Sequence, residues 1–163
     1  MEAFTSIESF KNIVHQTRKY YGKVNLPLPT RTFVGTVKLH GSNASVRYVR
    51  ATGELIPQSR NRELSIGSDN AGFACFVENN KQAILDLILS LHPMECNDGY
   101  LYEEITLFGE WCGGNIQNKV ALAEVPKHWV LFAAKIKLPQ SDVAVNDIES
   151  DEDSSTFYVP LPH

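Results

Sequence analysis

The chain has 163 residues, of which 43% are hydrophobic and 21% are charged, and this balance excludes disorder or a collagen repeat as a description of the whole chain. The length suits one domain with its own hydrophobic core. No apolar run approaches the roughly 18 residues of a membrane span, and the acidic N-terminus does not resemble a signal peptide. The three cysteines form no CxxC pair and the histidines are scattered, so we expect a cytoplasmic protein without a disulfide framework or a zinc site.

The formal net charge of -4 conceals an uneven distribution. Residues 1–62 hold ten Lys and Arg against three Asp and Glu, whereas residues 142–153 hold six acids and no base. The basic first part predicts a face for a polyanion, although an unevenly charged, solvated surface remains an alternative. The acidic stretch 141–155 is predicted to be a flexible loop or tail that lies away from any such face.

The first third of the chain predicts one helix followed by strands. Thr5 and Glu8 have capping-box spacing, and the apolar residues that follow lie on one helical face, so we expect a helix from about Ser6 to Tyr20. A proline-punctuated connection, NLPLPT, comes next. β-branched and alternating patterns then predict an antiparallel meander of three strands, at residues 31–38, 44–50 and 55–60.

The rest of the chain alternates helical and strand patterns. Apolar residues at helical spacing predict a helix over about Ala71–Leu91. Strands are expected at residues 100–111 and 156–159, and at the apolar stretch 129–138, which we expect to be buried on both faces. The predicted fold class is α+β, a mainly antiparallel sheet with packed helices, in one domain that spans residues 1–163.

The segment from Thr36 to Asn43, TVKLHGSN, carries the strongest chemical signal. Lys38 is expected at the end of a strand, and Gly41 allows backbone to approach a ligand closely. A lysine amine becomes a nucleophile when burial or nearby cations lower its pKa, and the basic part of the chain supplies such cations. Taken alone, a lysine beside a turn is more commonly exposed and inert.

Three further segments follow KLHGSN in order: SRNR at 59–62, LFGEWCGGNIQ at 107–117 and WVLFAAKI at 129–136. Together they resemble the RNA ligase 2-like family of ATP-dependent RNA ligases, covalent nucleotidyltransferases whose nucleophile motif takes the form K-x-H-G. The resemblance covers roughly residues 30–138. It implies part of a nucleotidyltransferase (adenylation) domain, and an enzyme that seals 5′-phosphate to 3′-hydroxyl RNA ends.

The resemblance assigns the reacting group and its neighbours. Lys38 matches the lysine that attacks the α-phosphate of ATP, and His40 and Gly41 match the rest of that motif. Asn43 matches an asparagine that supports the joining of RNA ends. From the pattern alone, Asn43 is equally typical of a turn, because its side chain bonds nearby backbone.

The resemblance also assigns the groups that hold the nucleotide. Arg60 matches an arginine that binds nucleotide or RNA phosphate, with Arg62 beside it as support for RNA. Glu110 matches a glutamate that contacts the ribose, and Phe132 an aromatic that stacks on adenine. The pattern alone leaves other interpretations open: a solvated hairpin for the arginines, an exposed strand end for Glu110 and a core position for Phe132.

The implied cofactors are ATP and Mg²⁺, with few protein ligands for the cation, and the implied partners are RNA ends. Two later family motifs, a Glu-Gly strand and a Lys-x-Lys strand, have no match at the expected place. The chain is therefore interpreted as a subunit of a split ligase whose partner supplies these motifs, as a fragment, or as a non-catalytic nucleotide- or RNA-binding subunit. A DNA ligase or capping-type enzyme is a further alternative, disfavoured by His40 where Asp is usual. A compact ligase of this type would suit a phage or virus.

Overall fold

The computed structural model describes residues 4, 8–30, 32–33, 35, 37–91, 102–139 and 156–160. The chain forms two compact units, Ala3–Lys38 and Leu39–His163, the second together with Met1–Glu2. Each unit is described by itself. The acidic stretch predicted at 141–155 lies outside the described residues.

The smaller unit contains helix α1, Phe10–Lys23. Ser9 is the N-cap, and its hydroxyl accepts a hydrogen bond from the Asn12 amide at 3.3 Å. The helix therefore begins later than the expected Ser6, because Ser9 takes the capping role that we assigned to Thr5, which lies outside the described residues. It also runs three residues past Tyr20 and ends before Asn25, whose φ of 51° cannot continue a helix.

The strand expected at 31–38 is wrong where it can be assessed. The described residues of this stretch lie in no strand, and Arg31, Val34 and Thr36 are outside the described part. Phe33 is 62% exposed and Val37 is 88% exposed. β-branched residues favour a strand only when a partner strand and a packed face are available, and this segment has neither among the described residues.

In the described part of the larger unit, five strands form one antiparallel sheet in the order β2-β1-β3-β4-β5. The prediction of an α+β fold with a mainly antiparallel sheet is confirmed. The hairpin of β1 and β2 is present, but β3 takes the place beside β1 that the meander gave to the segment 31–38. The strands are β1 (Ser42–Val49), β2 (Glu54–Ser59), β3 (Glu104–Cys112), β4 (His128–Lys137) and β5 (Thr156–Pro160).

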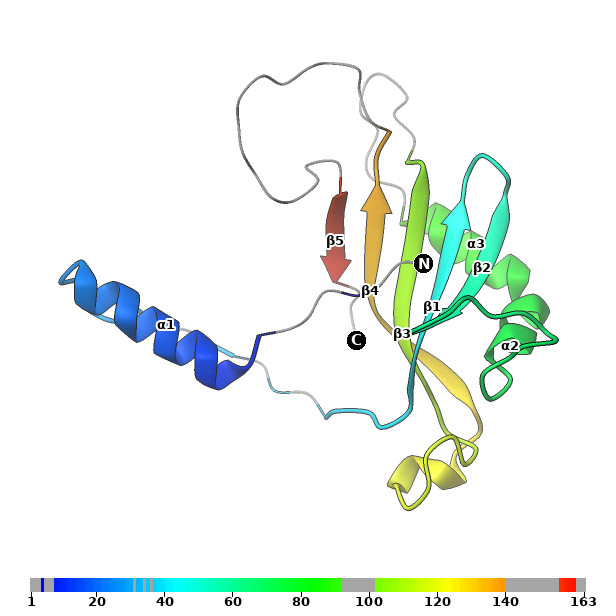
Figure 1. The fold of residues 1–163 in the computed structure, drawn as a ribbon, viewed down its shortest axis with the longest axis horizontal. Helices are drawn as coiled ribbons and strands as arrows, with labels where there is room; N and C mark the ends of the chain where they lie inside the picture. The colour runs from blue at the N-terminus through cyan, green and yellow to red at the C-terminus, as the bar shows by residue number, and fades with distance from the viewer. Residues whose placement is uncertain are drawn as a thin grey trace. The chain divides into compact units, whose positions relative to one another are not determined.

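The single helix expected at 71–91 is two helices, α2 (Phe73–Asn79) and α3 (Lys81–Ser90), which lie beside β1 and β2 in Figure 1. Asn80 separates them. Its side-chain amide donates to the Phe76 carbonyl at 2.8 Å, and its backbone N–H also bonds to that carbonyl. An Asn whose side chain bonds to a carbonyl of the preceding turn competes with continuation of the helix. The apolar residues on both sides keep helical spacing, but the helix is interrupted at Asn80.

Both helices pack on one face of the sheet. Phe73 and Ile88 are fully buried against Val46, Ile105 and Leu107, which belong to the same core cluster. Each such side chain contributes about 1.5–3 kcal/mol relative to exposure. The aromatic rings of Phe73, Phe76, Trp111 and Trp129 meet with centroids 4.9–6.5 Å apart.

Strand β4 is buried on both faces only near its middle. Ala133 and Ala134 are consecutive, so they face opposite sides of the sheet, and both are buried. The rest of the strand is mostly half-buried.

Candidate active site

The geometry of the site begins at Gly41, just before β1. The Gly41 amide donates to Oε1 of Glu110 at 2.8 Å, and the Gly41 carbonyl accepts a hydrogen bond from Nε2 of Gln117 at 3.0 Å. Both polar groups of one residue are therefore held by side chains from β3 and from the loop after it. Asn43 pairs with Glu110 in the register of β1 and β3, so the sheet brings the two predicted residues side by side.

Gly41 is required here for steric reasons. A Cβ atom at this position would overlap the Trp111 carbonyl and would lie 2.7 Å from the Cβ of Cys112. The backbone of Gly41 therefore lies directly against the end of β3, whereas the sequence analysis expected a close approach to a ligand. The partner in the structure is protein rather than ligand.

Lys38 and His40 lie on either side of the division between the two units. Lys38 is the last residue of the smaller unit and His40 is near the start of the larger one. Both side chains are exposed. Only Leu39 and His40 separate Lys38 from Gly41 in the chain.

Phe132 lies at a β-bulge. Phe108 pairs with Ala133 and Gly109 pairs with Leu131, which leaves Phe132 as an extra residue in β4. A bulge re-aims a side chain and is frequent beside functional sites. Phe132 is half-buried, so it is not a plain core residue.

Gly109, next to the bulge, makes room for the indole of Trp129. A Cβ on Gly109 would overlap the indole of Trp129. The indole N–H of Trp129 donates to the Ala44 carbonyl at 3.2 Å. The glycine of the FGEW segment thus allows a side chain from β4 to cross β3 and reach β1.

The two predicted arginines have different surroundings. The guanidinium of Arg62 donates to the carbonyl and hydroxyl oxygens of Ser68, at 2.7 and 2.6 Å, and to the Asp69 carbonyl at 3.0 Å. Arg62 therefore organises its own loop. Arg60 is exposed, and no hydrogen bond or ion pair of its guanidinium is found among the described residues.

The loop of Arg62 is also tied to the start of β1 and to α2. The Asn70 side chain donates to the Ser42 hydroxyl at 3.0 Å. The Asp69 carboxylate accepts from the amides of Ala74 and Cys75 at the start of α2. Burial acts to raise the pKa of Asp69, but these amides, that of Asn70 and the charge of Arg62 outweigh it and hold the pKa below its usual value.

The sheet face opposite the helices is rich in polar residues. Its alternating positions on β1, β2 and β3 include Asn43, Ser45, Arg47, Gln58, Thr106 and Glu110, together with the apolar Ile56 and Phe108. Ser45, Gln58, Thr106 and Phe108 are at most 2% exposed. Because buried polar groups are costly without partners, the polar residues of this face require hydrogen-bond partners.

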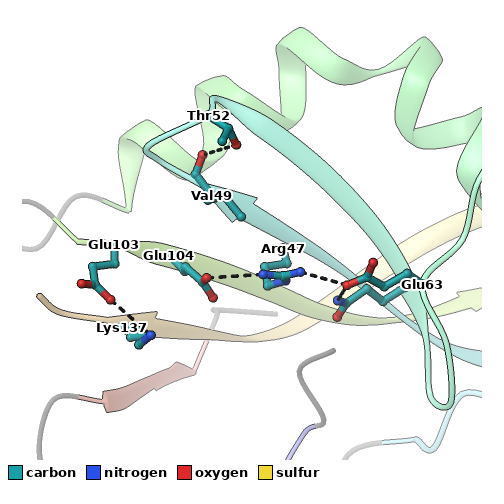
Figure 2. Close-up of polar contacts among 8 residues, drawn as sticks. Arg47, Val49, Thr52, Glu63, Glu103, Glu104 and Lys137 are labelled. Atoms are coloured by element: carbon teal, nitrogen blue, oxygen red, sulfur yellow. Dashed lines mark hydrogen bonds and ion pairs between the residues drawn. The ribbon is translucent and has the colours of Figure 1, made fainter.

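Arg47 lies at the centre of an ion-pair network on that face, shown in Figure 2. Its guanidinium lies 2.9 Å from a Glu63 oxygen and 3.3 Å from a Glu104 oxygen. Arg47 is 17% exposed in its side chain, so these pairs are less screened than surface pairs. Arg47 belongs to the basic part of the chain, which the sequence analysis expected to supply cations near Lys38, but the structure shows that its charge is balanced by two carboxylates.

Sequence reasoning missed the contacts of two residues that the fold brings to the site. Gln117 is the last residue of the segment 107–117, but no role was assigned to it, and its partner Gly41 lies 76 positions away in the chain. His128 pairs with Cys112 across β3 and β4, with Nε2 3.3 Å from Sγ. The register of β3 and β4 creates this pair across 16 positions of the chain, so local spacing does not indicate it.

The Cys112–His128 pair is not arranged as a nucleophile. Cys112 is fully buried. Burial first, and then the Glu110 carboxylate, raise the pKa of the Cys112 thiol above its ordinary value. A buried thiol with a raised pKa is a poor nucleophile.

The described residues include no group of three or more His, Cys, Asp and Glu side chains that could hold a metal ion. None of the helices in this part of the chain is long and apolar enough to cross a membrane.

Comparison with known proteins identifies the family. The family model for RNA ligase matches residues 31–150. The chain belongs to the RNA ligase family. The matched range contains Gly41 with its two side-chain hydrogen bonds, the Asn43–Glu110 pair and the β-bulge at Phe132. No curated protein matches the chain.

Proposed function

We propose that the chain is an ATP-dependent RNA ligase, or the adenylating part of one, with Lys38 as the nucleophile. The observation that carries the proposal is the K-x-H-G segment, whose Gly41 is held by Glu110 and Gln117 at the head of β1 in a member of the RNA ligase family. Gly41 lies three residues after Lys38 in the chain, so the motif that would carry the nucleophile ends at a backbone position that is held on both sides.

The proposed first step is transfer of AMP to the lysine. Neutral Nζ of Lys38 attacks the α-phosphorus of ATP, a P–N bond forms, and the bond to the pyrophosphate oxygen breaks. The amine proton leaves to solvent, and pyrophosphate is released. AMP then passes to a 5′-phosphate RNA end, and a 3′-hydroxyl displaces it to form the phosphodiester.

Several described residues support a nucleotide at this place. One oxygen of Glu110 is taken by the Gly41 amide, and the other is available to accept from a ribose hydroxyl. The bulge at Phe132 suits an aromatic platform for adenine. Arg60 offers an unengaged forked donor for phosphate.

Mg²⁺ would neutralise charge on the triphosphate oxygens. The side chains described here form no cage of three ligands, so we assign no protein ligand to it.

The test is self-labelling of the purified chain with Mg²⁺ and α-phosphate-labelled ATP, followed by denaturing electrophoresis. We expect acid-labile label on the protein that is lost in Lys38→Ala. Lys81→Ala is the matched control, because Lys81 is an exposed lysine on α3 and should label normally. A labelled Lys38→Ala variant would overturn the assignment.

The same assay separates the rival functions. Labelling by GTP in preference to ATP would indicate a capping-type enzyme, and sealing of DNA rather than RNA ends would indicate a DNA ligase. If the chain labels only with a second polypeptide that carries Glu-Gly and Lys-x-Lys motifs, it is a subunit of a split ligase. RNA or ATP binding without any labelling, alone or with that polypeptide, would favour a non-catalytic binding subunit.

A further inference from the structure

Helix α1 has a strongly basic surface that the proposed chemistry does not use. Its sequence, FKNIVHQTRKYYGK, contains four Lys and Arg and no Asp or Glu. At 100° per residue, the cations and His15 fall on one arc and the apolar residues on the opposite arc. The basic arc, which we call the basic face of α1, consists of Lys11, His15, Arg18, Lys19 and Lys23.

The basic face is exposed and its charges are not neutralised. Every residue of this face is exposed, and no residue of α1 is buried. None of its four cations takes part in an ion pair or a side-chain hydrogen bond among the described residues. Concentrated positive charge without acidic neighbours raises the local concentration of polyanions.

The dimensions fit a nucleic acid strand. Lys11 and Lys23 are twelve residues apart, which is about 18 Å along a helix at 1.5 Å per residue. At about 3.4 Å per step of a duplex strand, this length faces roughly five successive nucleotides.

We propose that the basic face of α1 binds the phosphate backbone of the RNA substrate. The inference rests on the proposed function for the choice of RNA. The helix belongs to the same compact unit as Lys38, so the cations and the proposed nucleophile share one structural unit. Phosphate contacts hold a strand in register and carry no sequence information, which suits an enzyme that acts at strand ends.

A membrane surface is the rival partner for a basic amphipathic helix. Membrane binding would use the apolar arc. Within its own unit, the Phe10 ring of that arc meets Phe33 edge-on with centroids 5.0 Å apart, although both rings stay largely exposed. The four cations of the basic face have no side-chain partner among the described residues, and this unneutralised charge favours a polyanion on the basic face.

The test measures RNA binding by fluorescence anisotropy without ATP, so its outcome does not depend on adenylylation. The probe is a short fluorescein-labelled RNA with a 5′-phosphate, titrated with the full chain at several salt concentrations. In the triple variant Lys11→Gln, Arg18→Gln and Lys19→Gln, we expect roughly tenfold or more weaker binding. We also expect the slope of log K against log salt to fall by about two, at about 0.7 per lost contact to a single strand.

Two controls keep the test decisive. Arg50→Gln with Lys81→Gln removes exposed cations from the larger unit and should leave both affinity and slope unchanged. Lys11→Arg with Lys19→Arg keeps the charge and should retain binding. Gln and Arg are good helix formers, and circular dichroism checks that helix content is preserved.

An unchanged affinity and salt slope in the triple variant would overturn the proposal, as would an equal loss in the Arg50→Gln, Lys81→Gln control. Vesicles containing phosphatidylserine form the last arm. Vesicle binding that the triple variant loses, with RNA binding unaffected, would assign the basic face to a membrane instead.

Discussion

A single added atom at Gly41 would disturb the backbone contact at the start of β1. A Cβ there would collide with the end of β3. In Gly41→Ala we therefore expect a loss of about 1–3 kcal/mol of stability, the usual cost of overpacking, and loss of self-labelling. Thermal unfolding and the labelling assay measure the two effects.

Gly22 provides a matched control for this substitution. It lies within α1, and a Cβ there would meet nothing within 4 Å. Gly22→Ala should leave stability unchanged or increase helix stability by up to about 1 kcal/mol. If Gly41→Ala behaved in the same way as Gly22→Ala, the tight contact between Gly41 and β3 would be refuted.

Gln117 acts on Gly41 through one hydrogen bond, to the carbonyl. Gln117→Met keeps the size of the side chain but removes the donor. We expect a loss of about 1 kcal/mol, typical of one hydrogen bond, and about fivefold slower labelling of Lys38. Asn118→Ala, at an exposed neighbour, should label at the normal rate. Equal rates in both variants would remove Gln117 from the positioning of Gly41.

At the scale of elements, the sequence patterns located the strands of the described sheet, β1, β2, β3, β4 and β5, to within a few residues. Each of these strands has a hydrogen-bonded partner. The patterns differ, because β1 alternates whereas β4 is a mostly apolar stretch. The segment 31–38 has the same residue types but no partner strand in the described part of the chain, so the strand predicted there was wrong. Asn80 divided the predicted long helix by a local side-chain contact that periodicity does not register.

The sequence motifs grouped Gly41, Asn43 and Glu110, which the structure brings together, but they did not predict the contacts that hold these residues. The motif order placed Asn43 and Glu110 in the same site, and strand register then set them opposite each other. The hydrogen bond from Gln117 to Gly41 and the contact of Cys112 with His128 depend on long-range packing. Contacts of that kind leave no spacing in the sequence.

The connection between the Arg62 loop and α2 makes a prediction about pH. Asp69 has a lowered pKa in the folded chain. A carboxyl group of this kind stabilises the fold at pH values above its unfolded pKa of about 3.9. The contribution is lost as the pH falls through the lower, folded value.

Asp69→Asn tests this linkage by thermal unfolding between neutral and acidic pH. At neutral pH the variant should be less stable than the unaltered chain, because an amide oxygen replaces a carboxylate that accepts from the amides of Ala74 and Cys75. The difference should shrink as the pH falls below about 4. Asp86→Asn on α3, an exposed position, should show no such convergence. A constant difference across the pH range would mean that the charge of Asp69 does not stabilise the loop.

At the scale of the whole molecule, stability is unevenly distributed. β3 is the central strand of the described sheet, hydrogen-bonded on both sides, and Ile105 and Leu107 are 0% exposed. α1 has 14 residues and buries none of them. Isolated helices of about 12–15 residues are marginal in water. Local opening should therefore cost least in α1 and most in β3.

Hydrogen exchange with mass spectrometry can measure this gradient. We expect peptides from α1 to exchange at least about a hundredfold faster than those from β3, which requires an opening free energy lower by about 3 kcal/mol at 1.4 kcal/mol per tenfold. α3 is the internal control for helical structure, because it is shorter than α1 but buries Ile84 and Ile88. Its exchange should be slower than that of α1. Equal protection of α1 and α3 would mean that α1 has a packing partner in solution. The basic face of α1 would then not be freely exposed to a polyanion.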